Sequence, residues 1–181
     1  MVALAPIATQ AACKSRFFTP RPRYGARTVA MAIVIHGIED LKSKVGKHLG
    51  WSDYHQVTQD QIDAFAEATG DHQWIHVNPE MAKAGPFGTT IAHGYLTLSL
   101  VPTLMAQVMT MEGVQMGVNY GANRVRFPAP VPSGARVRLG ASIAAVEEIA
   151  GGVQNLVDVT IEVEGAPKPS LVAQLVFRYY L

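Results

Sequence analysis

Three stretches of alternating apolar and polar residues near the C-terminus constrain the fold of this chain more than any other feature. In residues 136–147, 153–163 and 170–180, one set of alternate positions is almost entirely apolar, a period that is typical of strands burying one face. Short glycine-containing turns separate the three, which makes them antiparallel neighbours. Further strands are expected near 119–127 and within 51–57. The sequence therefore predicts an antiparallel sheet.

The longest apolar segment, residues 90–109, predicts the helix that covers this sheet. Its length would also suit a membrane span. Against a span stand His93, Pro102 and Gln107, together with four hydroxyl residues, so we expect a helix buried in a globular fold. A sheet with one face covered by a buried helix is an α+β sandwich of two layers.

Two shorter helices are expected before this segment, each with clear start signals. Thr58 and Gln61 have the spacing of a capping box, and the helix that they begin should end at Gly70. A second helix should begin with Asn78 as its N-cap and Pro79 as its first residue. The chain between these two helices is then a short connection.

Size and charge indicate a single globular domain without a nucleic-acid surface. The 181 residues suffice for one domain with a core but not for two. Residues 1–30 hold five of the 15 basic residues and no acid, so residues 31–181 hold 10 basic and 14 acidic residues, a net charge of −4. This mildly acidic body offers no basic face to nucleic acid. The single cysteine, Cys13, cannot form a disulfide within the chain.

The basic, acid-free residues 1–30 permit two interpretations. They have the composition of an organelle transit peptide, or they are an upstream extension with Met31 as the natural start. We favour the extension over organelle import, and we expect it to be disordered. Residues 31–181 are then a single domain, expected in the cytoplasm.

A carboxylate and an imidazole five residues apart are the main candidates for catalysis. Asp71 and His76 lie in a predicted turn over 71–77, where both side chains can converge on one water. Imidazole is the natural base near neutral pH, and such a pair can add water to a polarised carbonyl compound or remove it. The alternative is that Asp71 caps a turn and that His76 is a buried histidine with satisfied hydrogen bonds.

Gly94 is the predicted second component of the site, in the first turn of the long helix. Without a side chain, its N–H is open to a carbonyl oxygen on which negative charge develops. The alternative is that this glycine only permits close packing of the helix start on the sheet. The neighbouring His93 should hold the loop. No metal site is expected, because the pattern between His72 and His76 is not helical and no carboxylate triad accompanies them.

The stretch from Phe65 to Ser99 resembles the MaoC-like dehydratase family of (R)-specific enoyl-CoA hydratases, and most closely its branch similar to nodulation protein N. The family motif is an aromatic residue, Gly-Asp, a variable residue, Asn-Pro, an aliphatic residue and His, followed by a small residue, His and Gly where the central helix starts. In this chain the motif reads Phe65, Gly70-Asp71, His72, Gln73-Trp74, Ile75, His76 and then Ala92-His93-Gly94. Gln73-Trp74 stands in place of Asn-Pro, as in the nodulation-like branch. The resemblance covers roughly residues 45–181.

This resemblance implies a hotdog fold, in which an antiparallel sheet wraps around a long central helix, usually in a homodimer. It also implies catalytic roles for Asp71 and His76, with the backbone N–H of Gly94 as the oxyanion donor. The candidates for contacts with the substrate are His93, Leu96 and Ser99.

The predicted activity is the addition of water to trans-2-enoyl thioesters to give (R)-3-hydroxyacyl thioesters, and the reverse dehydration. CoA or the pantetheine of an acyl carrier would be part of the substrate, and no metal or redox cofactor is required. Two alternatives remain: a hotdog acyl-CoA thioesterase that attacks the thioester carbon itself, and a non-catalytic protein that binds acyl thioesters. The spacing of Asp71 and His76 favours hydration.

Overall fold

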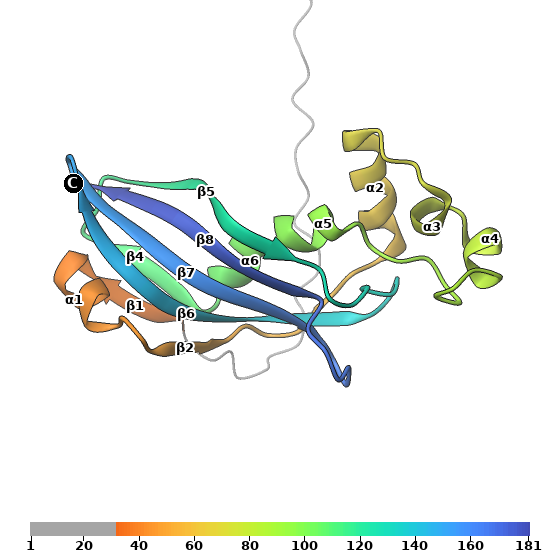
Figure 1. Cartoon of the computed structure of the whole chain (residues 1–181), viewed down its shortest axis with the longest axis horizontal. Coiled ribbons are helices and arrows are strands. Elements are labelled where there is room, and N and C mark those ends of the chain that lie inside the picture. The colour runs from red at the N-terminus through yellow and green to blue at the C-terminus, as the bar shows by residue number, and fades with distance from the viewer. Residues whose placement is uncertain (1–31) are drawn as a thin grey trace, which may run out of the picture.

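A curved antiparallel sheet dominates the computed structural model, which describes residues 32–181 (Figure 1). The strand order is β2-β6-β7-β8-β5, and β3 also pairs with β6. The strands are β2 His48–Trp51, β3 His55–Gln56, β5 Met116–Arg126, β6 Arg136–Ile149, β7 Gly152–Val163 and β8 Leu171–Tyr180. Within the strand predicted over 51–57, the structure has only the last residue of β2 and the two residues of β3. The predictions for residues 1–30 and for a start at Met31 lie outside the described residues.

The predicted buried faces of the three C-terminal strands are confirmed. The buried alternate positions are Val137, Leu139, Ala141 and Ile143 in β6, Val153, Asn155, Val157, Val159 and Ile161 in β7, and Leu171, Ala173 and Leu175 in β8. A register shift between Ile143 and Ala145 interrupts this alternation in β6. Because a bulge re-aims the side chains that follow it, Ala145 is only half-buried and Val146 packs against the core instead.

The helix predicted over 90–109 is shorter than expected and consists of two pieces, α5 Gly94–Ser99 and α6 Val101–Met105. Leu100 separates them. Pro102 contributes to the break, because it has no N–H with which to continue the hydrogen-bond ladder. Both pieces still supply the core that covers the sheet, with Leu96, Val101, Leu104 and Met105 buried against it.

A small parallel pair of strands completes the cover and was not predicted. β1 Ile33–His36 pairs with β4 Met109–Glu112, and α1 Gly37–Ser43 follows β1 directly. β4 begins where the central helix was expected to end. Ile35 of β1 and Leu41 of α1 are buried and form part of the main core. In Figure 1 the unit lies at the end of the sheet opposite to α2, α3 and α4.

Three helices extend beyond the other end of the sheet (Figure 1): α2 Gln59–Thr69, α3 Trp74–Val77 and α4 Pro79–Lys83. Both hydrogen bonds of the predicted capping box at Thr58 are present, and Gly70 ends α2 in the left-handed conformation, with φ of 77°. Asn78 caps α4 as predicted. The predicted turn over 71–77 is partly wrong, because its second half is the single helical turn α3.

The arrangement is the predicted α+β class, with an antiparallel sheet wrapped around a short central helical segment. No helix within residues 32–181 has both the length and the apolar character needed to span a membrane. The cytoplasmic location stays a prediction.

Candidate active site

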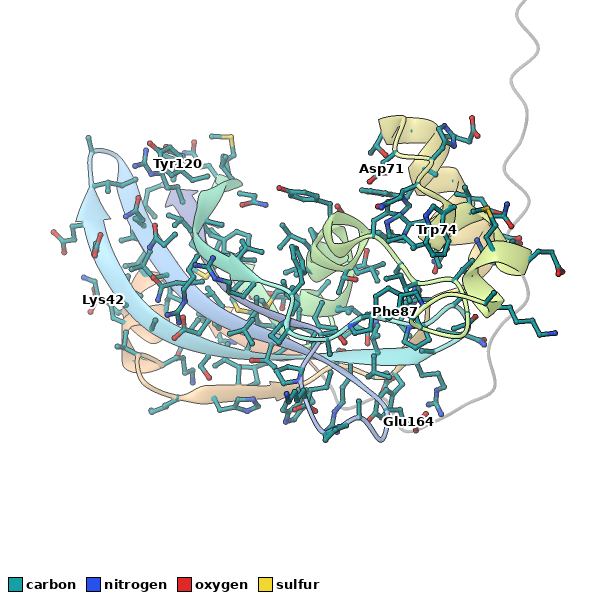
Figure 2. All side chains as sticks on the ribbon, turned by 45° about the vertical axis from the view of Figure 1, so that its right-hand side comes forward. Lys42, Asp71, Trp74, Phe87, Tyr120 and Glu164 are labelled. Atoms are coloured by element: carbon teal, nitrogen blue, oxygen red, sulfur yellow. The ribbon has the colours of Figure 1, made fainter. Side chains whose placement is uncertain are left out.

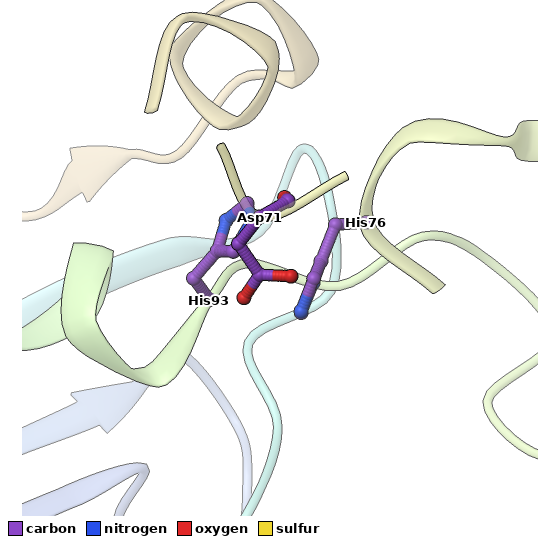
Figure 3. Close-up of side chains that lie close together, drawn as sticks. All are labelled: Asp71, His76 and His93. Carbon is purple, nitrogen blue, oxygen red and sulfur yellow. The ribbon is translucent and has the colours of Figure 1, made fainter. Parts of the chain in front are cut away.

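Asp71 and His76 converge, as the sequence predicted, and His93 joins them. The ligand-type atoms of these three side chains all lie within 4.8 Å of one another. Figure 3 shows the Asp71 carboxylate beside the rings of both histidines. The three residues come from the connection between α2 and α3, from α3 itself, and from the residue before α5. Figure 2 shows Asp71 and Trp74 at the helical end of the molecule, far from Lys42.

The orientation of His76 is fixed by the backbone around it. Its Nδ1–H donates to the carbonyl oxygen of Ile91 over 2.7 Å, and the Ile91 N–H donates in turn to Ile75 O over 3.0 Å. Gln59 holds the same residue from α2, since its Nε2 donates to His76 O over 2.8 Å while its Oε1 accepts from Thr90. The proton on Nδ1 leaves Nε2 of His76 with a lone pair and no proton.

Burial lowers the pKa of His76 below its usual value, because the charged imidazolium is poorly solvated there. The hydrogen bond to the Ile91 carbonyl opposes this effect, and the nearby His93 adds to it. Asp71 raises the pKa slightly, as the last of the contributions. At neutral pH the ring is therefore an uncharged base.

A cavity of about 260 Å³ opens beside the pair. Its lining consists of His76, Phe87, Ile91, Ala92, Gly94, Thr97, Phe127, Pro128, Ala129, Pro130, Val131 and Ser170. Gly94 is the first residue of α5, so its N–H has no acceptor within the helix. A base and an unpaired N–H donor thus face the same space.

The packing interpretation of Gly94 is supported by the structure, and its role as an oxyanion donor stays a prediction. A Cβ at this position would lie 3.0 Å from Phe127 Cδ2, so the missing side chain permits close packing, as the alternative proposed. The same absence leaves the N–H accessible from the cavity.

The three predicted substrate contacts are distributed differently from expectation. His93 is buried and absent from the cavity lining, with its ring stacked on that of His76. Leu96 belongs to the hydrophobic core. Ser99 lines a second cavity of about 440 Å³, between the helices α5 and α6 and the strands β5 and β8. None of the three faces the cavity that His76 lines.

Several residues of the site were not predicted. Phe87, Phe127 and the proline-rich segment 128–131 form much of the cavity wall, and the dense prolines after a strand were the available signal. Gln59 gave no such signal, because the hydrogen bonds that tie it to His76 and Thr90 join segments distant in the sequence.

The cluster of Asp71, His76 and His93 contains both bonded and free ligand-type atoms. Nδ1 of His76 is bonded to Ile91 O, and Nε2 of His93 is bonded to the carbonyl oxygen of Asp71. The Asp71 carboxylate, Nε2 of His76 and Nδ1 of His93, which has no partner among residues 32–181, remain as ligand-type groups. The absence of a metal site stays a prediction.

Comparison with known proteins places this geometry in a family. The model of the protein family described as "MaoC like domain" matches residues 40–165. 3-Hydroxyacyl-thioester dehydratase Z from Mycobacterium tuberculosis H37Rv is 54% identical over 143 residues, which cover 78% of this chain and 95% of that protein. Nodulation protein N from Rhizobium leguminosarum bv. viciae is 44% identical over 140 residues, covering 75% and 86%.

A solved structure supports the same fold. The (R)-hydratase from A. caviae superposes with a TM-score of 0.61 at 22% sequence identity, and the match covers 74% of this chain and 94% of that chain. At this identity the likeness concerns the fold alone. The predicted hotdog fold and the predicted resemblance are both confirmed.

Proposed function

The chain belongs to the MaoC-like family, and on this premise we propose that it interconverts trans-2-enoyl thioesters and (R)-3-hydroxyacyl thioesters by adding and removing water. One observation carries the proposal. A neutral imidazole with a free Nε2 and an unpaired backbone N–H line one cavity, and the Asp71 carboxylate lies within 4.8 Å of the imidazole. These groups supply the base, the proton relay and the oxyanion donor that hydration of an enoyl thioester uses.

Gly94 supplies the polarising group in this mechanism. Its N–H donates to the thioester carbonyl oxygen, which draws electrons from the conjugated double bond and makes C3 electrophilic. The donation strengthens as the oxygen gains negative charge, so it stabilises the transition state more than the substrate.

His76 and Asp71 divide the proton transfers. One water lies between them, and its oxygen bonds to C3 while Nε2 of His76 takes one of its protons. The electron pair of the double bond moves toward the carbonyl oxygen, and the resulting enolate takes at C2 the proton that His76 removed from the water, relayed through the Asp71 carboxylate. This transfer returns both groups to their starting states. Hydroxyl and hydrogen arrive from the same face, which gives one stereoisomer.

The acyl thioester itself is the only organic partner that this chemistry requires. CoA or an acyl carrier's pantetheine enters as part of the substrate, and no step draws on a metal ion or a redox group.

The exposed edge of the sheet supports a homodimer. β5 is an edge strand of 11 residues, and nearly all of them are exposed. Met116 and Tyr120 on this strand, and Phe127 just after it, are exposed large hydrophobic residues. A long exposed edge is a template for pairing, and antiparallel β5-to-β5 pairing about a twofold axis would cover it.

Sedimentation equilibrium tests this assembly. Met116→Lys with Tyr120→Lys should give monomers, because the charges would face each other across the pairing, whereas Val34→Lys on β1 should leave the dimer intact. A dimer that survives the double substitution would place the interface elsewhere.

An absorbance assay tests the activity. The enoyl absorbance of crotonyl-CoA should fall on addition of the protein, and chiral chromatography should recover (R)-3-hydroxybutyryl-CoA. Formation of the (S) isomer, or no hydration of crotonyl-CoA and of longer enoyl-CoA compounds, would contradict the proposal.

A further inference from the structure

His93 is a buried histidine for which the proposed mechanism has no step. It precedes α5 and is only 3% exposed. Its ring stacks on His76 with 3.8 Å between centroids and 27° between planes. The ring of Phe65 from α2 also contacts it, at 5.1 Å and 49°. Three aromatic rings from three segments therefore pack together behind the cavity.

The same imidazole holds the backbone of Asp71. Its Nε2 lies 2.9 Å from the Asp71 carbonyl oxygen, so the ring carries a proton on Nε2 and donates it. Two other hydrogen bonds of Asp71 are longer: its N–H reaches Thr69 Oγ1 over 3.5 Å, and its Oδ1 accepts from the Gln73 N–H over 3.4 Å. The bond from His93 is thus the shortest recorded for Asp71 in the described part of the chain.

The second nitrogen of this ring points to a role beyond packing. Nδ1 of His93 is buried and has no hydrogen-bond partner among residues 32–181. Such atoms are rare in folded proteins and each requires an explanation. An apolar ring would fill the same space without this cost. An imidazole adds a donor at the ring edge, and that donor reaches Asp71.

We propose that His93 is a positioning residue, which sets the separation and orientation of Asp71 and His76 without touching the substrate. One rigid ring holds the first residue by a hydrogen bond and the second by stacking. Displacement of a reacting group by about 1 Å can cost about 100-fold in rate, so the ring contributes to turnover through the two residues that it aligns. This inference rests on the proposed hydratase function.

Two variants separate the donor from the ring. His93→Phe keeps an aromatic ring and loses the donor, whereas His93→Gln keeps an N–H donor and loses the ring. We expect kcat to fall about 10- to 100-fold in His93→Phe and less in His93→Gln, while KM stays within about threefold. The matched control is His72→Gln, which removes an exposed histidine adjacent to Asp71 and should leave both constants unchanged.

A double-mutant cycle identifies the residue through which His93 acts. In the Asp71→Asn background, His93→Phe should reduce kcat much less than it does in the wild-type chain, because the aligned carboxylate is already lost. A merely structural role would instead reduce kcat by the same factor in both backgrounds.

Imidazole NMR gives a readout that needs no activity. The titratable groups that face His76 are Asp71 and His93, and the presence of His93 lowers the pKa of His76. His93→Phe should therefore raise the titration midpoint of His76 and shift its ring resonances. This NMR result does not depend on whether the wild-type chain hydrates enoyl thioesters. A failure of the positioning proposal can therefore be distinguished from a failure of the proposed function.

The proposal is overturned if His93→Phe keeps wild-type kcat with unchanged His76 resonances. It is also overturned if both His93 variants lose soluble protein, or if His93→Gln is as impaired as His93→Phe and the cycle is additive. A selective loss of kcat, partial rescue by glutamine and a non-additive cycle support it.

Discussion

Replacing His76 by glutamine tests the base directly, and the structure gives the size of two separate effects. The first is on turnover. Glutamine cannot take a proton from water, and general-base help contributes about 100- to 10,000-fold, or about 2.7 to 5.4 kcal/mol in activation free energy. We expect kcat to fall by at least about 100-fold. Asp71→Asn should cause a loss of similar size.

The second effect of His76→Gln is on stability. The ring donates to the Ile91 carbonyl oxygen over 2.7 Å, and a buried carbonyl without its donor costs about 1 to 3 kcal/mol. For a chain of this size each kcal/mol lowers Tm by about 2 to 4 °C. The variant should therefore remain folded at 25 °C.

Steady-state hydration of an enoyl-CoA and thermal unfolding by circular dichroism measure the two effects on the same sample. His72→Gln serves as the control, since the side chain of His72 is 49% exposed and its partner in the structure is Glu67 at 3.7 Å. Near-normal turnover in a folded His76→Gln would refute the assignment of this residue as the base.

Three further predictions follow from the same geometry. Because burial lowers the pKa of His76 below 6.5, kcat/KM should hold as pH falls to about 6.5 and drop only through the lowered pKa, where the base gains a proton. Between pH 6.5 and the lowered pKa, His76 takes up a proton in the unfolded chain but not in the folded chain, so the free energy of unfolding measured in urea should decrease as the pH falls. A decline in kcat/KM centred above pH 7 would contradict this prediction. Gly94→Ala should lower the free energy of unfolding by about 1 to 3 kcal/mol and lower kcat/KM, because its Cβ would lie 3.0 Å from Phe127. An unchanged urea midpoint with unchanged kinetics would show that Phe127 can move aside without cost. Thr58→Ala removes the acceptor for the Gln61 N–H at the start of α2 and should destabilise the fold by about 1 kcal/mol, and an unchanged urea midpoint would show that the capping box adds nothing.

Elements with local signals were predictable from the sequence. The capping box at Thr58, the left-handed Gly70 and the N-cap Asn78 depend on residues within one helical turn of each other. The alternation of β6, β7 and β8 likewise reports one buried face for each strand. Asp71 and His76 were predicted because the helix signals on both sides confine them to a short connection.

Features that depend on distant contacts were not predictable. Ile33 pairs with Met109, and no local pattern shows that these segments meet. The break at Leu100 was missed because the long apolar segment around Pro102 indicated one continuous helix. The position of His93 depends on Phe65 and His76 at once, and the sequence shows only that these three residues belong to one motif, not that their rings pack together. Tertiary packing decided each of these cases.

The most direct test of the account is to follow enoyl absorbance and free thiol together. Hydration places water at C3 and leaves the thioester intact, whereas a thioesterase attacks the carbonyl carbon and releases the thiol. With a trans-2-enoyl-CoA, absorbance should fall with no thiol released. A saturated acyl-CoA of equal length has no electrophilic C3 and should remain intact while inhibiting the reaction. Rapid thiol release from the saturated compound, with no hydration of the unsaturated one, would contradict the central claim.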